Sequence, residues 1–176
     1  MTMAEIHAPR LRLLSLTLDQ LKQYLLSPHD LEAALGFAIA PLDPAGPVHR
    51  AINIKISKMA QAAESDHLWY TYWLIVTCQE AYGAGMIGFK GIPNMLGEAE
   101  IGYGIEPAYQ RKGYMTEAVR LLVEWAFQSG RCEAVTAETR PDNIPSQRVL
   151  QKVGMRHYGV LDEMLLWRID KPGADF

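Results

Sequence analysis

Hydrophobic and polar residues recur along this chain with two different periods, which predict strands and helices in turn. Alternating residues, or runs rich in β-branched and aromatic residues, predict strands at residues 10–16, 68–78, 86–90, 98–105, 134–139 and 164–169. Apolar residues at helical spacing predict helices at residues 18–26, at residues 30–35, after residue 113 and at residues 146–153. Prolines and a glycine predict a loop at residues 41–47.

Residues 52–63 fit both periods. Ile52 and Ile54 alternate as in a strand, whereas Ile52, Ile56 and Met59 share one face of a helix, and we favour the helix. Strands interleaved with helices predict an α/β (α+β) fold, with a mixed sheet of about six to seven strands and helices on both faces.

A glycine-rich motif, G-A-G-M-I-G at residues 83–88, matches the dinucleotide-binding fingerprint and follows a predicted strand. Its continuation, F-K-G-I-P at residues 89–93, cannot open the helix that would hold a pyrophosphate. We therefore interpret the glycines as the turn of a hairpin that joins residues 68–78 to residues 86–90. A nicotinamide enzyme is the rival interpretation.

Composition narrows the class of protein. A chain of 176 residues, 49% hydrophobic and 21% charged, is expected to form one domain over residues 1–176. The net charge of −3 argues against a nucleic-acid partner. Cys78 and Cys132 read as free thiols in a reducing compartment, and the five histidines are scattered, so no metal is expected. With no signal-peptide pattern and no apolar run long enough for a bilayer, we expect a cytoplasmic protein without a membrane partner.

The most informative segment leads from the strand at residues 98–105 into the helix after residue 113. The loop between them reads Q-R-K-G-Y-M at residues 110–115, with two cations and one glycine. Amides in the first turn of a helix have no partner within the helix, and its positive end favours an anion. Gly113 allows a ligand to approach the backbone closely. The segment therefore predicts a pyrophosphate cradle.

This loop resembles the acetyl-CoA loop of the GNAT superfamily of N-acetyltransferases, whose pattern is Gln/Arg, two variable residues, Gly, one variable residue and Gly/Ala. A second segment, R-P-D-N-I-P-S at residues 140–146 with a closing Gly154, resembles the RimJ/RimL-like branch of ribosomal-protein alanine acetyltransferases. The segment P-R-L-R-L at residues 9–13 is placed where that branch has its first strand. The resemblance implies a GNAT fold, with acetyl-CoA as cosubstrate and no metal.

The resemblance also implies roles for single residues. Amides of residues 111–116 would bind the pyrophosphate, and Arg111 and Lys112 would add charge. The backbone of residues 103–105 would pair with the pantetheine arm, and an amide of that strand would stabilise the oxyanion. The implied cofactor-binding residues are Tyr103, Gly104, Ile105, Gln110, Arg111, Lys112, Gly113, Tyr114, Met115, Thr116, Asn143 and Ser146.

Two of these residues have structural alternatives. Asn143, implied as a partner of the pantetheine arm, could instead form a turn after Pro141. Ser146 corresponds to a serine that protonates the leaving sulfur in that branch, but it could equally cap the following helix. Many superfamily members use a tyrosine for this proton. The corresponding position here is Leu150, so a tyrosine mechanism is not available at that position.

Glu100 is the candidate general base, since several family members place a carboxylate on the equivalent strand. The alternative is an exposed strand charge that shares its face with Glu98. Freeing a lysine amine with a pKa near 10.4 costs about 4.6 kcal/mol at pH 7, whereas an α-amine near 8 already has a usable free-base fraction. A weak or water-mediated base would therefore suit α-amines.

The loop departs from the family pattern at Arg111, where relatives often have glycine, at Met115, where a small residue is usual, and at Met155, where phenylalanine is usual. Arginine is compatible with this loop only if its backbone angles are ordinary.

These observations predict an N-acetyltransferase that acylates a primary amine by direct transfer, with Glu100 and Ser146 as catalytic candidates. Protein N-terminal α-amines and small-molecule amines both remain open as acceptors, and the protein is expected to be a monomer or a homodimer. We expect the acceptor pocket near the two short helices at residues 18–35 and near residues 158–164, where Asp162 and Glu163 could attract a cation. The alternative function is a non-catalytic acyl-CoA-binding module.

Overall fold

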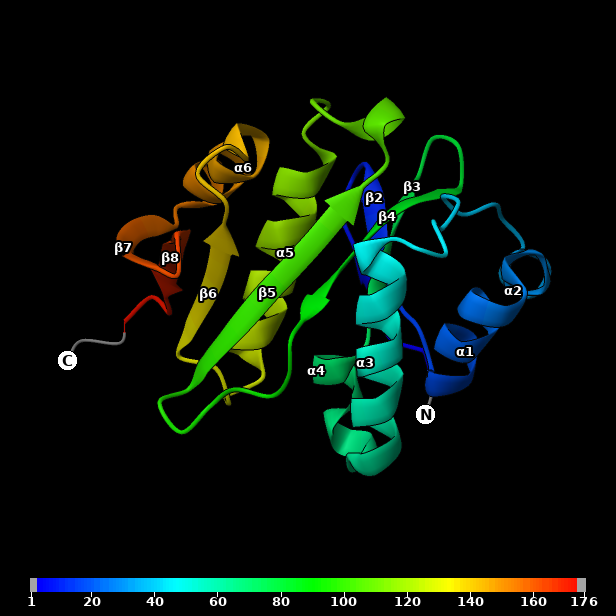
Figure 1. The fold of residues 1–176 in the computed structure, drawn as a ribbon, viewed down its shortest axis with the longest axis horizontal. Coiled ribbons are helices and arrows are strands. Elements are labelled where there is room, and N and C mark those ends of the chain that lie inside the picture. Colours follow the sequence, from blue (N-terminus) through cyan, green and yellow to red (C-terminus); the bar gives the residue numbers. More distant parts are fainter. Residues whose placement is uncertain (1–2, 174–176) are drawn as a thin grey trace.

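Eight strands within residues 3–173, the part of the chain that the computed structural model describes, form one mixed sheet (Figure 1). The strands are β1 Glu5–His7, β2 Leu11–Ser15, β3 Trp73–Thr77, β4 Tyr82–Phe89, β5 Glu98–Ile105, β6 Ala134–Thr139, β7 Arg156–Leu161 and β8 Met164–Asp170. Their order is β1-β2-β3-β4-β5-β6-β8-β7, and β5 runs parallel to β6. The expected mixed sheet is confirmed, with more strands than the expected six to seven.

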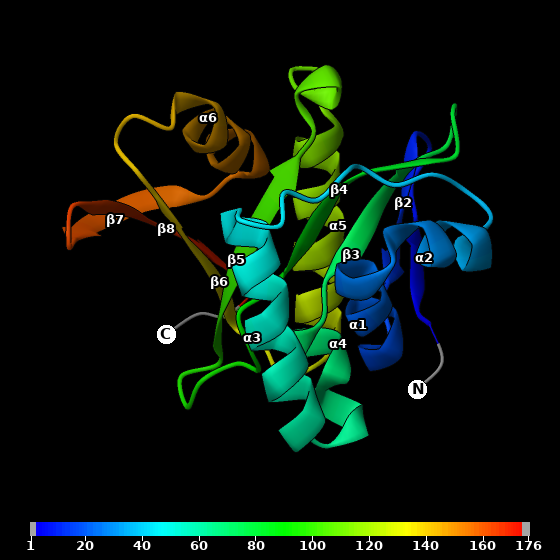
Figure 2. The same ribbon diagram turned by 45° about the vertical axis from the view of Figure 1, so that its right-hand side comes forward.

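Helices cover both faces of the sheet, as expected. They are α1 Leu18–Leu26, α2 Pro28–Leu35, α3 Pro47–Gln61, α4 His67–Tyr70, α5 Tyr114–Gln128 and α6 Ile144–Val153, with short 3-10 turns η1 Glu64–Asp66 and η2 Pro107–Tyr109. In Figure 1, α3 lies in front of the sheet and α5 behind it, and Figure 2 shows α1 on the same side as α3. Within residues 3–173, no helix has the length and apolar character needed to cross a membrane.

The alternation of side chains along β3 divides the core in two. Trp73 and Ile75 point to one face, where they join Leu122 of α5 in one buried cluster. Leu74 and Val76 point to the other face and join a second cluster with residues of α1, α2 and α3. Both faces of β3 are therefore buried, which explains why its sequence is a continuous apolar run.

The prediction of one strand over residues 68–78 is wrong in its first part, which belongs to α4, and β3 starts only at Trp73. Trp69 in α4 is buried, and its ring centre lies 5.0 Å from that of Phe89 and 4.8 Å from that of Trp125. Aromatic residues favour strands because they fit a half-buried sheet surface. Here an aromatic cluster gives the same burial to a helical turn, so the strand preference does not decide the backbone.

The glycines of residues 83–88 lie inside β4 and not in the predicted turn. β3 and β4 do form the expected antiparallel hairpin, but its turn is residues 78–81. A Cβ atom at Gly85 would lie 2.3 Å from the carbonyl oxygen of Gly104, so glycine lets the neighbouring strand approach. The element that follows β4 is β5 and not a helix, which excludes the geometry that the dinucleotide fingerprint requires.

Two prolines that were expected to interrupt the chain begin helices instead. Pro28 is the first residue of α2, and Pro47 is the first residue of α3. Proline suits this position because the N–H that it lacks would have no partner there, and its φ is already close to helical. The helix favoured for residues 52–63 is thus confirmed over residues 52–61 as part of α3, which begins and ends earlier than expected.

The two edge strands were not predicted. β1 is only three residues long, and all residues of β7 except the half-buried Gly159 are exposed. Without a buried face, neither strand carries the apolar alternation by which strands are found in a sequence.

Lys55 is a buried lysine that links α3 to the sheet. It is 7% exposed, and its Nζ donates to the carbonyl oxygens of Tyr70, Thr71 and Phe89 at 3.1, 3.3 and 2.6 Å. Burial, with a smaller contribution from the charge of Lys58, lowers the pKa of Lys55 to about 7.

We expect Lys55 to make the stability of the fold depend on pH. In the unfolded chain its pKa returns to about 10.4. Between about pH 7 and that value, the unfolded state binds a proton that the folded state has released, so stability rises with pH. The free energy of unfolding of the native chain, relative to that of Lys55→Met, should rise across this window and stay level below it. Denaturant titrations of both proteins over the same pH series measure the difference, and a constant difference would contradict the prediction.

Candidate active site

β5 and β6 separate before they end, and this opens a wedge in the sheet (Figure 1). The two strands pair only from Glu98 with Ala134 to Glu100 with Thr136. Beyond these pairs, β5 is held by β4 as far as Ile105, and β6 is held by β8. The second half of β5 therefore has one edge whose main-chain donors and acceptors have no strand partner.

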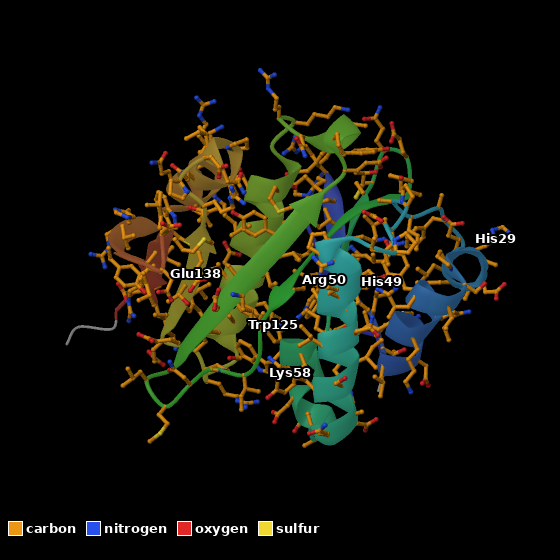
Figure 3. All side chains as sticks on the ribbon, viewed as in Figure 1. His29, His49, Arg50, Lys58, Trp125 and Glu138 are labelled. Carbon is orange, nitrogen blue, oxygen red and sulfur yellow. The ribbon has the colours of Figure 1, made fainter. Side chains whose placement is uncertain are left out.

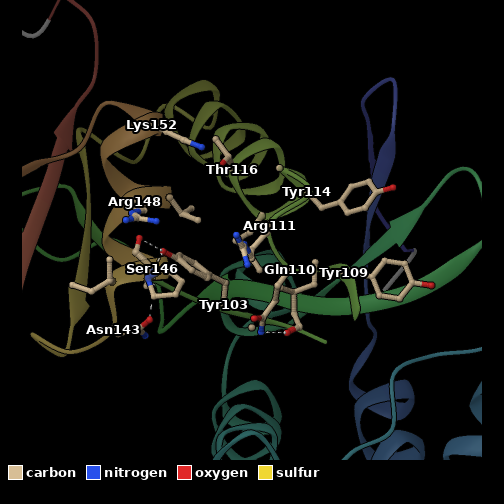
Figure 4. Close-up of a pocket in the computed structure, with 17 residues that line it drawn as sticks. Tyr103, Tyr109, Gln110, Arg111, Tyr114, Thr116, Asn143, Ser146, Arg148 and Lys152 are labelled. Carbon is tan, nitrogen blue, oxygen red and sulfur yellow. Dashed lines mark hydrogen bonds between the residues drawn. The ribbon is translucent and has the colours of Figure 1, made fainter. Parts of the chain in front are cut away.

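A cleft of about 840 Å³ lies at this opening (Figure 4). Its walls are the end of β5, the loop after η2, the first turn of α5 and one side of α6 along its length. The structure brings together in this cleft all but one of the implied cofactor-binding residues: Tyr103, Gly104, Ile105, Gln110, Arg111, Gly113, Tyr114, Met115, Thr116, Asn143 and Ser146.

The start of α5 has the properties of an anion site. Gly113 is its N-cap, and no side chain caps this end of the helix. The main-chain N–H groups of Tyr114, Met115 and Thr116 thus lack intrahelical partners, and the helix adds partial positive charge there. Gly113 has a φ of 85°, in the left-handed region that glycine adopts without strain. The residues present therefore fit a diphosphate group.

Arg10, the residue before β2, contacts both this loop and α5. Its Nη2 lies 2.7 Å from Oε2 of Glu117 in α5, and its Nη1 donates to the carbonyl oxygen of Lys112 at 2.9 Å. A Cβ atom at Gly113 would lie 3.1 Å from Nη2 of Arg10. Arg10 therefore packs against the glycine and links the loop to the first turn of α5.

Arg111 has a φ of 62°, which is the left-handed conformation. An ordinary backbone was the condition for tolerating arginine here, and the structure does not meet it. This conformation costs a non-glycine residue about 1–2 kcal/mol of conformational free energy, which explains why glycine suits the position. The preceding Gln110 donates its Nε2–H to the carbonyl oxygen of Ile105 at 3.2 Å, which ties the loop to the end of β5.

We expect two substitutions of Arg111 to separate strain from charge. Arg111→Gly and Arg111→Ala both remove the guanidinium, but only glycine relieves the positive φ. The glycine variant should be more stable by about 1 kcal/mol, while both variants should lose acetyl-CoA affinity by similar factors. Thermal denaturation and titration calorimetry measure the two quantities. Equal stability of the variants would show that the loop adopts another conformation in solution.

The cationic side chains that line the cleft differ in part from those expected from the sequence. Lys112 is not among the lining residues, and its Nζ lies 5.1 Å from the centre of the Tyr109 ring. Arg148 and Lys152 of α6 line the cleft together with Arg111 (Figure 4). Positive charge thus comes to the cleft from the loop before α5 and from α6, which are distant in the sequence.

The start of α6 resolves one alternative for Ser146. The N-cap of α6 is Asn143, whose Oδ1 accepts a hydrogen bond from the main-chain N–H of Ser146 at 3.3 Å. Ser146 therefore does not cap this helix, and its hydroxyl is free for another role. Within the described part of the chain, the side-chain nitrogen Nδ2 of Asn143 makes no hydrogen bond, so it can donate to a ligand.

A tyrosine does contact Ser146, but from β5. The hydroxyl of Tyr103 lies 2.8 Å from Oγ of Ser146 (Figure 4). Leu150, at the family's tyrosine position, is fully buried in the core. Burial raises the pKa of Tyr103 to about 12, so its hydroxyl keeps its proton at neutral pH.

Glu100 lies outside the cleft. Its neighbours Ala99 and Ile101 belong to the core on the α5 side, so its side chain points to the opposite face of the sheet. There the carboxylate forms an ion pair with Lys90, whose Nζ also lies 3.9 Å from Oε2 of Glu138. Figure 3 shows Glu138 on this side of the molecule. Glu100 can therefore reach a reacting amine only through the wedge or through water.

The exposed turn between β7 and β8 is formed by Asp162 and Glu163. These are the two residues that the sequence suggested for attracting a cationic acceptor. Both have positive φ angles, of 48° and 66°, and neither lines the cleft. Among the described residues, no group of three or more His, Cys, Asp or Glu side chains is placed to hold a metal ion.

Three features of the site were not found from the sequence. Arg148 and Lys152 are four positions apart in a predicted helix, so a helical projection would have placed them on one face. The contacts of Arg10 and Tyr103 have no such local signal, because their partners lie 102 or more and 43 positions away.

Comparison with known proteins gives one family. A family model described as an acetyltransferase (GNAT) domain matches residues 10–156. The uncharacterized N-acetyltransferase YjdG of Bacillus subtilis (strain 168) is 37% identical over 82 residues, which cover 47% of this chain and 49% of that protein. The matched segment thus spans about half the length of this relative.

Two further similarities concern proteins named for ribosomal substrates. The ribosomal-protein-serine acetyltransferase of Escherichia coli (strain K12) is 30% identical over 79 residues, which cover 45% of this chain and 44% of that protein. The crystal structure of ribosomal-protein-S5-alanine acetyltransferase from Vibrio fischeri superposes with a TM-score of 0.67 at 17% identity, covering 97% of this chain and 98% of that one. The second similarity shows a shared fold.

Proposed function

Because the chain belongs to the GNAT acetyltransferase family, we propose that it transfers the acetyl group of acetyl-CoA directly to a primary amine. The observation that carries this proposal is the cleft at the opening between β5 and β6, where the uncapped start of α5 meets the unpaired edge of β5. A diphosphate and an extended amide-containing arm are the groups that such a pair of surfaces would bind.

The binding residues divide according to the parts of the ligand. Main-chain amides from Arg111 to Thr116 hold the diphosphate, supported by the charges of Arg111, Arg148 and Lys152. The unpaired edge of β5 around Gly104 pairs with the pantetheine arm, and the amide nitrogen of Asn143 donates to the same arm. These roles place the thioester near the wedge and near Ser146.

Acetyl-CoA supplies an activated acetyl thioester. A main-chain amide of β5 near the wedge stabilises the oxyanion that forms when the amine attacks, and the hydroxyl of Ser146 donates to the leaving sulfur. A leaving thiol with a pKa near 8.5, like that of cysteine, needs little help from an acid. A serine hydroxyl is therefore a sufficient donor.

The acceptor that fits best is an α-amine at the N-terminus of a protein. Glu100, the candidate base, is engaged by Lys90 and acts at most through water, so it would deprotonate a lysine amine poorly. An α-amine with a pKa near 8 needs no strong base. Two similar proteins are named as a ribosomal-protein-serine and a ribosomal-protein-S5-alanine acetyltransferase, which supports the same class of acceptor.

The test is thiol release from acetyl-CoA in the presence of a panel of amines. Peptides that begin with serine or alanine should give saturable release, and the same peptides with a blocked N-terminus and an internal lysine should give none. Release with polyamines alone would instead assign a small-molecule acceptor. Saturable acetyl-CoA binding without release by any amine would contradict catalysis and favour a module that only senses the cofactor.

A further inference from the structure

Tyr103 reaches from β5, at the wedge, to α6. It follows the last residue pairs that join β5 to β6, and its ring packs against the core on the α5 side. Its hydroxyl lies 2.8 Å from Oγ of Ser146 and 3.4 Å from the carbonyl oxygen of the same residue. Because Oδ1 of Asn143 accepts from the main-chain N–H of Ser146, this serine is fixed at two atoms.

Either hydroxyl could donate in this hydrogen bond, and the chemistry of the two groups favours one direction. A phenol is a stronger acid than an aliphatic alcohol, so Tyr103 is the better donor and Ser146 the better acceptor. Burial raises the pKa of Tyr103 to about 12, which keeps the donor proton in place at neutral pH. Within residues 3–173, Oγ of Ser146 has no second hydrogen-bond partner. With Tyr103 donating, the proton of Ser146 is left free to point into the cleft.

We propose that Tyr103 is a positioning residue for the acetyl transfer: its hydroxyl donates to Oγ of Ser146 and thereby turns the proton of Ser146 toward the leaving sulfur. Without this donor, the serine hydroxyl would rotate among several orientations, including those that direct its proton back to a main-chain carbonyl oxygen. This inference rests on the proposed function. It concerns the side chain of Tyr103, in addition to the pairing of its backbone with the pantetheine arm.

The step balances without a further reagent. The free amine nitrogen forms the new bond to the acetyl carbon, and the carbon–sulfur bond breaks with its electron pair on sulfur. Ser146 donates its hydrogen bond to this sulfur as the negative charge develops. The proton that the acylated nitrogen gives up to solvent equals the proton that the thiolate takes up on leaving. Tyr103 keeps its own proton throughout.

The experiment is a double-mutant cycle on Tyr103→Phe and Ser146→Ala, measured by thiol release with the best amine of the panel. Tyr103→Phe keeps the ring and removes only the hydroxyl. It should lower kcat about tenfold, the equivalent of one hydrogen bond, and change the KM for acetyl-CoA by less than about twofold. Ser146→Ala should lower kcat at least as much. The double variant should be no slower than Ser146→Ala alone, because Tyr103 acts through the serine.

A control variant and the wild-type protein distinguish a failure of the role of Tyr103 from a failure of the proposed function. Tyr82→Phe also removes a bonded tyrosine hydroxyl, 2.7 Å from Oε2 of Glu106, but Tyr82 does not line the cleft and its loss should leave kcat unchanged. Multiplication of the two single effects in the double variant, or an unchanged kcat in Tyr103→Phe, would overturn the role of Tyr103 while the proposed function stands. Absence of amine-dependent release from the wild-type protein would overturn the proposed function and this role with it.

Discussion

Gly113→Glu is expected to abolish acetyl-CoA binding while the sheet and helices persist. Gly113 has a φ of 85°, and a Cβ atom there would meet Arg10 at 3.1 Å. The new carboxylate would also add negative charge to the loop that must hold the diphosphate. Two like charges about 4 Å apart repel by about 4 kcal/mol at the effective dielectric constant near a protein surface. The affinity should therefore fall at least about 100-fold, as measured by titration calorimetry.

The matched control is Gly130→Glu, just beyond the other end of α5. Gly130 also has a positive φ, of 71°, and an added Cβ atom there meets nothing within 4 Å. This variant carries the same change in charge and a similar backbone strain, but far from the cleft along the helix. It should bind acetyl-CoA as the native chain does. Native affinity in Gly113→Glu, with an intact circular dichroism spectrum, would show that the diphosphate is bound elsewhere.

Arg10→Ala is expected to weaken acetyl-CoA binding about tenfold although Arg10 does not line the main cleft. An exposed ion pair alone contributes less than about 1 kcal/mol. Arg10 does more, because it bonds both Glu117 and the carbonyl oxygen of Lys112. Its loss would free the loop to move and leave the Glu117 carboxylate unpaired beside the expected phosphates, which accounts for the larger factor.

Two further variants test this explanation of Arg10. Arg12→Ala, two residues further along the chain in β2, breaks a comparable pair with Glu5 at 2.7 Å and should not change binding. The double variant Arg10→Ala, Glu117→Ala should recover part of the affinity, since it removes the unpaired carboxylate. Titration calorimetry of the four proteins gives the comparison. An equal loss in Arg10→Ala and Arg12→Ala would mean that only the general charge of the surface matters.

The prediction of secondary structure from sequence is confirmed where an element depends on a short segment of chain. The strand at residues 98–105, the loop with Gly113 and the start of α5 are contiguous, so the backbone chemistry of the anion site could be predicted from a few neighbouring residues. β6 was likewise predicted with its observed bounds because its apolar alternation is undisturbed.

The failures have two physical causes. Tertiary packing overrode local preference in α4, where Trp69 joins an aromatic cluster, and in β4, where Gly85 permits a close strand contact instead of a turn. The contacts of Arg10 with the loop and of Tyr103 with Ser146 depend on how the sheet folds. No residue close to Arg10 or to Tyr103 in the sequence indicates the contact partner of that residue.

The location of the cofactor-binding surfaces affects how the product CoA leaves after each turnover. Under the proposed function, the start of α5 and the free edge of β5 bind the diphosphate and the pantetheine arm, which acetyl-CoA and free CoA have in common. After transfer, these contacts remain unchanged, and only the two-carbon group has left. We therefore expect product inhibition by CoA, and a rate that depends on the ratio of acetylated to free coenzyme more than on the amount of either.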